Sequence, residues 1–263
     1  MGLKALLLAL VVAVSPASYV ASRQQADGGF AERGARSAPE LTAWAVLGLV
    51  AAGKPPAGAA SYLISKPTGD TTDVALRALA LLALGADAGA MLDRLTPRVD
   101  GRIGTLVNST IWGVLALRAA SRPVPTACVR FLLRQQRRSG GWSWYQRGAP
   151  DSNDTAAAIQ ALRAVGVRGK PLTRGLAYLR RLQGKDGGFA LVRGRASDSQ
   201  STAWAIQAFI SAGKKPPAAA FRFLARMRRA DGSYRYSARY VVTPVWVTAQ
   251  VLPALAGKPF PLR

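Results

Sequence analysis

One short pattern decides the fold, and it reads Thr42-Ala-Trp-Ala-Val-Leu-Gly-Leu-Val-Ala-Ala-Gly53 where it first occurs. The same order of threonine, small and apolar residues returns at Thr110–Ser121, Thr155–Gly166 and Thr202–Gly213. Each copy begins with a residue suited to a helix N-cap, and most end at glycine, the usual C-cap. Because the copies are apolar nearly all the way round, each is expected to be a helix buried on every side.

A second kind of helix is expected between these buried ones. Thr173–Gln183 places Leu176, Leu179 and Leu182 on one stripe and basic residues on the other face, which is typical of a surface helix. With two further inner segments at Thr72–Gly85 and about 245–257, six inner helices are predicted. The six outer helices are expected near residues 18–25, 57–66, 88–95, 127–136, 173–183 and 218–228.

These repeats predict one domain. The inner segments that begin at residues 42, 72, 110, 155 and 202 are 30 to 47 residues apart, which is one helical hairpin per repeat. No segment looks like the polar end cap of an open solenoid. The sequence therefore predicts an all-α chain in which residues 18–263 form a single (α/α)6 toroid of six helical hairpins.

A motif recurs where an outer helix leads into an inner one. Gln24 is followed by Gly28-Gly-Phe30, Gln136 by Gly140-Gly-Trp142, and Gln183 by Gly187-Gly-Phe189. This resembles the QW repeat of squalene and oxidosqualene cyclases and the related repeats of protein prenyltransferase β-subunits, the terpenoid cyclase and protein prenyltransferase superfamily. We expect a structural role, in which the glutamine amide bonds a free backbone group at the outer-helix end and the aromatic ring packs beneath it.

A second resemblance concerns possible chemistry. Asp151-Ser-Asn153-Asp154-Thr-Ala is similar to the Asp-x-Asp-Asp-Thr-Ala motif of class II terpene cyclases, whose middle aspartate is the general acid that protonates an alkene or epoxide. Asn153 stands at that position, and an amide has no acidic proton to give. Asp151 and Asp154 remain, and they are expected either to share a proton, as close carboxylates do, or simply to cap the helix.

Other activities of similar folds are disfavoured by the residues present. The chain has no histidine and one cysteine, Cys128, so the Asp, Cys and His zinc site of protein prenyltransferases is missing, as is the Cys-Gly-Glu-Gln of thioester domains. No metal or cofactor is expected. The resemblance to class II cyclases implies a cavity built between two helical domains, whereas this chain has length for only one.

The inner-helix N-termini should meet at one rim of the ring, which is the expected ligand site. Trp44, Trp112 and Trp204 are instead expected to be core residues. Aspartates 151 and 198 are the only pair to nominate for glycosidase-like chemistry. The ligand-site candidates are Glu40, Asn108, Trp144, Tyr145, Asn153, Asp198, Gln200 and Tyr236.

Two functions are compatible with this rim. One is a non-catalytic toroid that binds a small molecule or peptide, as in the secreted cobalamin carriers that the ring resembles. The alternative is a reduced class II terpene cyclase acting on an isoprenoid, with Asp151 and Asp154 as the remnant acid motif. The missing acid, zinc ligands and thioester favour the first, although a centre filled by side chains would count against it.

The N-terminus and the charge indicate where the chain acts. Lys4 precedes the apolar run Ala5–Val14, and Ser15-Pro-Ala17 offers small residues for cleavage, so residues 1–17 are expected to be a signal peptide of a secreted bacterial-type protein. Lysine and arginine outnumber aspartate and glutamate by 36 to 13, a net charge of +23. The expected partner is an anionic cell-envelope surface, since no nucleic-acid-binding motif is present.

Overall fold

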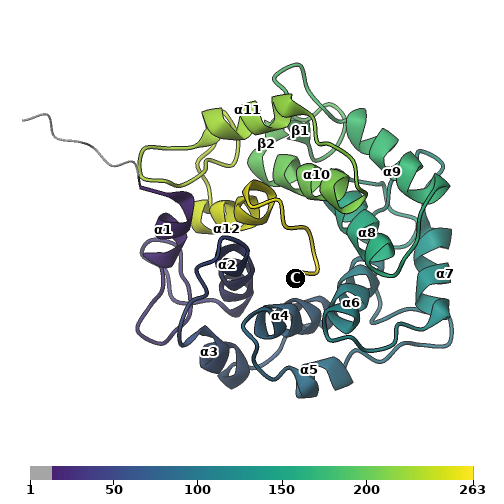
Figure 1. The fold of residues 1–263 in the computed structure, drawn as a ribbon, viewed down its shortest axis with the longest axis horizontal. Coiled ribbons are helices and arrows are strands. Elements are labelled where there is room, and N and C mark those ends of the chain that lie inside the picture. The colour runs from purple at the N-terminus through teal and green to yellow at the C-terminus, as the bar shows by residue number, and fades with distance from the viewer. Residues whose placement is uncertain (1–13, 263) are drawn as a thin grey trace, which may run out of the picture.

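Six inner helices surrounded by six outer helices form a closed ring (Figure 1). The structure, a computed structural model, describes residues 14–262. The inner helices are α2 (Pro39–Ala51), α4 (Thr71–Ala83), α6 (Val107–Ala119), α8 (Ser152–Ala164), α10 (Ser199–Ser211) and α12 (Pro244–Leu255). The outer helices are α1 (Pro16–Ala21), α3 (Ala59–Ser65), α5 (Gly89–Asp93), α7 (Thr126–Gln135), α9 (Lys170–Arg180) and α11 (Ala218–Met227). The predicted (α/α)6 toroid is therefore confirmed.

The ring closes where α12 packs against α2 (Figure 1). Gly48 lies at this seam, because a Cβ atom added to it would overlap the backbone carbonyl of Ala249. Both helices are buried around most of their circumference, as their apolar sequences predict. The closest approach in the seam is thus between backbones, and it depends on the absence of a side chain at residue 48.

The repeated threonine has a different role from the predicted N-cap. The inner helices begin about one turn earlier, so Thr42, Thr110, Thr155 and Thr202 each occupy the fourth helical position. Their hydroxyl groups, and that of Thr248, accept a hydrogen bond of 2.8–3.1 Å from the backbone N–H of the repeat aromatic or its equivalent. The donors are Phe30, Ile103, Trp142, Phe189 and Tyr234. These bonds attach the loop of each repeat to its inner helix.

The second inner helix, α4, is the one exception. It begins at Thr71, so its fourth position is Val74 rather than Thr72. Valine has no hydroxyl group and makes no such bond. The correct alignment of this repeat is therefore two residues later than the sequence pattern suggested, and the α4 N-terminus is capped by the Asp70 carboxylate, which accepts from the Asp73 N–H at 3.0 Å.

The repeat glutamines join neighbouring outer helices. The Gln24 amide donates to Gly28 O at 3.0 Å within its own turn, and to Ala57 O at 2.6 Å just before α3. Gln136 donates likewise to Gly140 O and to Pro171 O in α9, both at 2.8 Å. The predicted structural role is therefore present, with a partner in the next repeat that the sequence did not reveal.

A turn glycine makes this junction possible. Gly28 has φ +83°, and a Cβ atom there would lie 2.5 Å from Gly58 O in the next repeat. Gly140 and Gly187 also have positive φ and also lie against backbone of the following outer helix. The glycine is therefore required both by its conformation and by the close approach of the next repeat.

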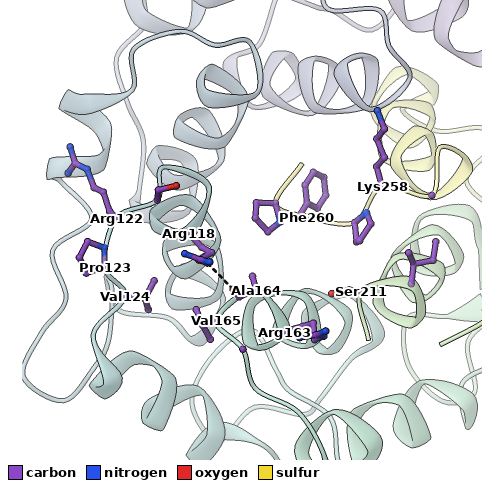
Figure 2. Close-up of a pocket in the computed structure, with 16 residues that line it drawn as sticks. Arg118, Arg122, Pro123, Val124, Arg163, Ala164, Val165, Ser211, Lys258 and Phe260 are labelled. Atoms are coloured by element: carbon purple, nitrogen blue, oxygen red, sulfur yellow. Dashed lines mark hydrogen bonds between the residues drawn. The ribbon is translucent and has the colours of Figure 1, made fainter. Parts of the chain in front are cut away.

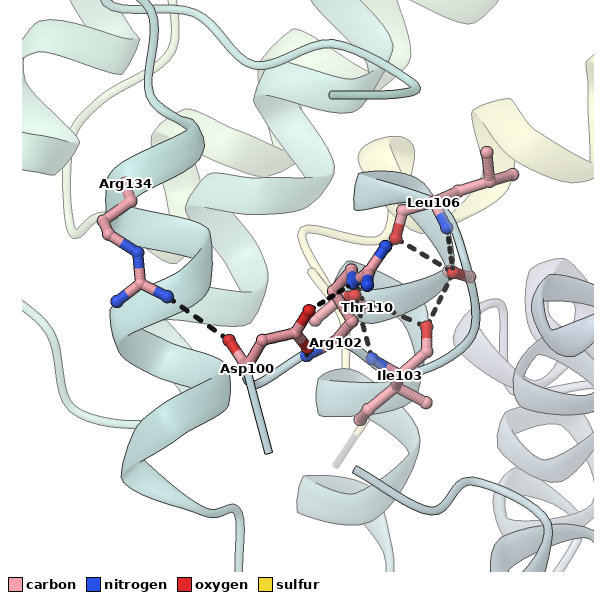
Figure 3. A network of polar contacts seen from close by, with 7 residues as sticks. Asp100, Arg102, Ile103, Leu106, Thr110 and Arg134 are labelled. Atoms are coloured by element: carbon pink, nitrogen blue, oxygen red, sulfur yellow. Dashed lines mark hydrogen bonds and ion pairs between the residues drawn. The ribbon is translucent and has the colours of Figure 1, made fainter. Parts of the chain in front are cut away.

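The degenerate third turn uses other contacts for the same purpose (Figure 3). Arg134 of α7 donates to the Asp100 carbonyl at 3.3 Å, and Arg102 pairs with the Asp100 carboxylate at 2.7 Å. The Ser109 hydroxyl donates to Ile103 O at 2.7 Å. Arginine thus connects this loop to the next outer helix, where glutamine does so in the regular copies.

One short pair of strands departs from the expected all-helical pattern. A short antiparallel pair, β1 (Phe189–Ala190) and β2 (Ser197–Asp198), aligns Phe189 with Asp198 before α10.

The predicted signal peptide lies mostly outside the described residues, and its cleavage point after Ala17 falls inside α1. Val14 O accepts from Arg228 at 2.9 Å, so the segment just before α1 also contacts the α11 end.

The chain after α12 turns into the centre of the ring (Figure 1). Phe260 is buried there, and its backbone N–H donates to Gln160 Oε1 on α8 at 2.8 Å. This segment enters from the end of the ring where the inner helices terminate. It therefore closes the centre on that side, opposite the rim of inner-helix N-termini.

Candidate functional site

A cavity of about 290 Å³ opens at the predicted rim, among the first turns of the inner helices. The inner-helix residues around it come in two layers, one on either side of the repeat threonine or its equivalent in α4, Val74. The layer two residues before this position is mainly polar, and half of the layer two residues after it is tryptophan. The outer layer consists of Glu40, Thr72, Asn108, Asn153, Gln200 and Trp246, and the inner layer of Trp44, Leu76, Trp112, Ala157, Trp204 and Gln250.

Three indole rings form the floor of this cavity. Trp44, Trp112 and Trp204 pack edge to face in a triangle, with ring centroids 5.4–5.7 Å apart. Phe260 lies against all three, at 5.7–6.3 Å. The tryptophans are buried, as expected of core residues, and they also line the cavity. The ring centre is therefore filled in its lower part and hollow only above the indoles.

A separate pocket of about 900 Å³ lies at the opposite end of the ring (Figure 2). Arg118, Arg122 and Arg163 line it together with the tail residues Lys258 and Phe260. Arg118 donates to Ala164 O at 2.9 Å, a bond that satisfies a carbonyl at the α8 C-terminus. The indole triangle and Phe260 thus separate a basic pocket from the acidic cavity at the rim.

Two carboxyl groups meet at the wall of the rim cavity. Asp151 is the N-cap of α8, and its Oδ1 accepts from the Asp154 backbone N–H at 2.8 Å. Asp154 is 4% exposed. Burial, reinforced by the Asp151 charge, raises the pKa of the Asp154 carboxyl well above its usual range, and burial also raises the pKa of Asp151. Burial therefore favours the neutral form of the Asp154 carboxyl beside an aromatic cavity.

Asn108 positions this acid. Its Nδ2 donates to Asp154 Oδ1 at 2.6 Å, and its Oδ1 accepts from the Thr72 hydroxyl at 3.3 Å. The bond from Asn108 lowers the pKa of Asp154, opposing burial and Asp151 without cancelling them. It also leaves the second carboxyl oxygen, Oδ2, as the place for the proton. The chain Thr72–Asn108–Asp154 therefore fixes which oxygen can act as an acid.

The structure brings together most of the predicted site residues. Asp151, Asp154 and five of the eight ligand candidates line the cavity, namely Glu40, Asn108, Trp144, Asn153 and Gln200. Tyr145, Asp198 and Tyr236 do not line it. Asp198 instead caps α10, where its carboxylate accepts from the Ser201 N–H at 2.7 Å, and this separate role disfavours pairing it with Asp151 for glycosidase chemistry.

Asp198 makes the stability of the fold depend on pH. Burial raises its pKa from 3.8 to about 6, although bonds from Ser201 oppose the shift. The native state keeps this proton while the unfolded chain loses it, so stability should fall as pH rises from about 4 to about 6, by roughly 3 kcal/mol. Urea unfolding of wild type and Asp198→Asn at several pH values measures this, since asparagine caps a helix equally well. Parallel curves for the two proteins would contradict it.

The sequence analysis missed Trp246 and Gln250 on α12 and Leu76 on α4, all of which line the cavity. Their positions relative to the repeat threonine could have identified them in the sequence. Once the threonine is placed at the fourth helical position, residues two before and two after it lie about one turn apart on the face toward the ring axis. Applied to Thr248, this rule selects Trp246 and Gln250.

Comparison with known proteins places the chain in a family. The sequence profile of the squalene-hopene cyclase C-terminal domain matches residues 70–244, about two thirds of the chain. The chain belongs to this squalene-hopene cyclase domain family. No curated protein sequence matches it. The squalene-hopene cyclase match includes α4 to α11 and thus the Asp151–Asp154 segment, where the family resemblance was first seen.

Solved structures show the same fold at low sequence identity. A protein from Actinoplanes has a TM-score of 0.70 and 19% identity, covering 92% of this chain and 97% of that one. The type II terpene cyclase MstE from Scytonema has a TM-score of 0.69 and 17% identity, covering 92% and 95%. The ent-copalyl diphosphate synthase from Streptomyces platensis has a TM-score of 0.59 and 22% identity, covering 83% and 50%.

The MstE comparison corrects one expectation. From the sequence, class II cyclases are expected to need two helical domains, and this chain is long enough for only one. MstE carries the name type II terpene cyclase, and this chain covers 95% of it. A single toroid is therefore long enough, and chain length no longer argues against that activity.

Residues 14–262 contain no helix long and apolar enough to cross a membrane. Within the same residues there is no cluster of three or more histidine, cysteine, aspartate or glutamate side chains placed to hold a metal ion. Cys128 is buried in α7, where burial raises the pKa of its thiol. Carboxyl, amide and indole groups line the rim cavity.

Proposed function

We propose that the rim cavity binds a small isoprenoid and that Asp154 protonates one of its double bonds. The observation that carries this proposal is the Asp154 carboxyl, which is buried in the wall of an indole-floored cavity and whose pKa is raised by that burial. Burying a carboxyl group destabilises the fold, and carboxyls with a strongly raised pKa are concentrated at catalytic sites. The membership of the squalene-hopene cyclase family supports the same chemistry.

The proposed step moves one proton. The Oδ2–H bond of Asp154 breaks, the alkene π electrons form the new C–H bond, and a carbocation remains on the substrate. Asn108 Nδ2, 2.6 Å from Oδ1, stabilises the carboxylate that Asp154 becomes. Transfer of a proton from a neighbouring carbon of the cation back to the Asp154 carboxylate ends the reaction and restores the acid, so the product is an isomer of the substrate, cyclic or rearranged.

The floor of the cavity suits such a cation. Trp44, Trp112 and Trp204 surround its base, and indole faces attract cations more strongly than other aromatic rings do. The edge-to-face triangle also excludes water from below, where Phe260 covers it. A cation formed above these rings would be stabilised and shielded from water on that side.

Deuterium uptake tests this proposal. The protein is incubated in D2O with geraniol, farnesol, geranylgeraniol and their diphosphates, and the recovered compounds are analysed by mass spectrometry. We expect an isomer carrying one deuterium on carbon, because the proton on Asp154 exchanges with solvent before it is transferred. If none of these compounds gains carbon-bound deuterium beyond a protein-free control, the proposal is wrong.

A second candidate function is the non-catalytic binding first expected from the sequence. Asn153 favours it, because it occupies the position of the family's acid and lines the cavity. Asn153→Asp distinguishes the two. If wild type binds isoprenoids without deuterium uptake and the variant gains uptake, the natural protein is a binding toroid. If wild type already catalyses uptake, Asp154 suffices, and we expect less than a tenfold change in the variant.

We further propose that the chain acts outside the cytoplasm at an anionic envelope surface. The support is the apolar N-terminal run and the net charge of +23. Vesicles with anionic lipid should bind the protein at low salt and release it as salt rises, whereas neutral vesicles should not bind it. Salt-independent binding to neutral vesicles would contradict this electrostatic contact.

A further inference from the structure

The amide of Gln250 is held in one orientation at the edge of the cavity floor. Its Oε1 accepts two hydrogen bonds, from Trp204 Nε1 at 2.8 Å and from Gln200 Nε2 at 2.9 Å. An indole N–H can only donate, so the atom facing Trp204 must be the amide oxygen. The other end of the side chain, Nε2, is therefore a donor whose position the structure fixes.

Two residues that line this cavity each carry a buried donor without a hydrogen-bond partner among the described residues. Gln250 Nε2 and Trp44 Nε1 are both buried and make no hydrogen bond to residues 14–262. They lie on α12 and α2, the neighbouring helices of the ring seam, and both residues line the rim cavity. Buried donors are nearly always satisfied in proteins, so an unpaired couple in one cavity indicates a missing acceptor.

We infer that the ligand of the rim cavity carries a neutral acceptor oxygen, such as a ketone or ether, which Trp44 Nε1 and Gln250 Nε2 bind. A negatively charged group is disfavoured because the carboxyl groups of Glu40 and Asp151 line the same wall. At roughly 30 Å³ for each non-hydrogen atom, the cavity encloses about ten of them. The inference thus rests on the cavity of the proposed function and narrows its substrate to a small oxygenated isoprenoid.

A matched pair of ligands tests this. Camphor and bornane share one ten-carbon skeleton, and only camphor has a carbonyl oxygen. Neither has an alkene, so their binding does not depend on proton transfer by Asp154. An apolar cavity without donors would prefer the hydrocarbon. We expect camphor to bind at least about tenfold more tightly than bornane in headspace depletion measurements with the full-length protein.

Variants assign the effect to the two donors. Trp44→Phe keeps a ring in the floor but removes the N–H, and Gln250→Leu removes the amide. Each should reduce the preference for camphor about tenfold. Trp142→Phe is the matched control, because Trp142 Nε1 donates to Leu132 O away from the cavity at 2.7 Å. Its preference should equal that of wild type.

Other outcomes overturn the inference. Equal affinity for both ligands in wild type would mean that water satisfies the donors, and tighter binding of bornane would mean that they do not face the ligand. Failure of both ligands to bind would show that the cavity does not accept rings of this size. Deuterium uptake by the open-chain isoprenoids decides the proposed function separately in each case.

Discussion

Replacing Asp154 by asparagine should reduce deuterium uptake by at least about 1000-fold, the upper part of the range for loss of a general acid. The amide keeps an Oδ1 atom to accept from Asn108, which donates to Asp154 at 2.6 Å, but it has no acidic proton. Because burial raises the pKa of Asp154, the variant also loses an unfavourable buried ionisable group. Its free energy of unfolding at pH 7 should therefore equal or exceed that of wild type.

Two further variants show whether a loss of uptake in Asp154→Asn is specific to that acid. Asp70→Asn changes an N-cap carboxylate of α4 that does not line the cavity, and it should leave uptake unchanged. Asp151→Asn removes the charge that helps to raise the pKa of Asp154, so that pKa should fall. The acid then loses its proton at lower pH, and the alkaline limb of the pH–rate profile should move down. Uptake that survives in Asp154→Asn would assign the proton to another group.

Replacing Gly48 by alanine should destabilise the protein by about 3 kcal/mol. The added Cβ would overlap the Ala249 carbonyl, a backbone atom that can move only if α12 moves away from α2. Overpacking against a rigid neighbour costs more than the higher helix propensity of alanine returns. Chemical denaturation, compared at equal slope, measures the loss.

Gly113→Ala is the matched control for this seam. Gly113 is also inside an inner helix, but its added Cβ would meet side-chain atoms of the buried Ile103 at 2.8–2.9 Å rather than a backbone atom, so a shift of one side chain can make room. We expect a smaller loss than in Gly48→Ala, about 1 kcal/mol. Equal losses in the two variants would mean that the α2–α12 seam is no tighter than the rest of the ring.

The overall architecture could be predicted because it repeats. Segments such as 42–53 and 202–213 are similar enough to be aligned by eye, and a helix without a polar face can only be an inner one. Helix starts were harder. The threonine resembles an N-cap, yet the hydroxyl accepts a bond from the loop in every such repeat, and at Thr42, Thr110 and Thr202 it donates to the carbonyl four residues back. A long-range partner thus decided a position that local preference had placed elsewhere.

The site was only partly predictable for a related reason. Polar residues near the inner-helix N-termini were found, but Tyr145, Asp198 and Tyr236 belong to the surrounding loops and do not line the cavity. Which residues of an inner helix lie at the rim depends on where the helix begins, and each repeat threonine lies four residues after the observed N-cap instead of being that cap. The burial that raises the pKa of Asp154, and the filling of the lower centre by Phe260, arise from packing between distant segments.

The seam between α2 and α12 has a consequence for how the chain folds. α2 ends at Ala51 and α12 begins at Pro244, so the contacts that complete the ring join residues that are far apart in the sequence. Contacts of such long range form slowly, because the intervening chain must be ordered first. Until they form, the apolar flanks of α2 and α10 face solvent. During synthesis the growing polypeptide is therefore most vulnerable to aggregation just before its sixth repeat emerges.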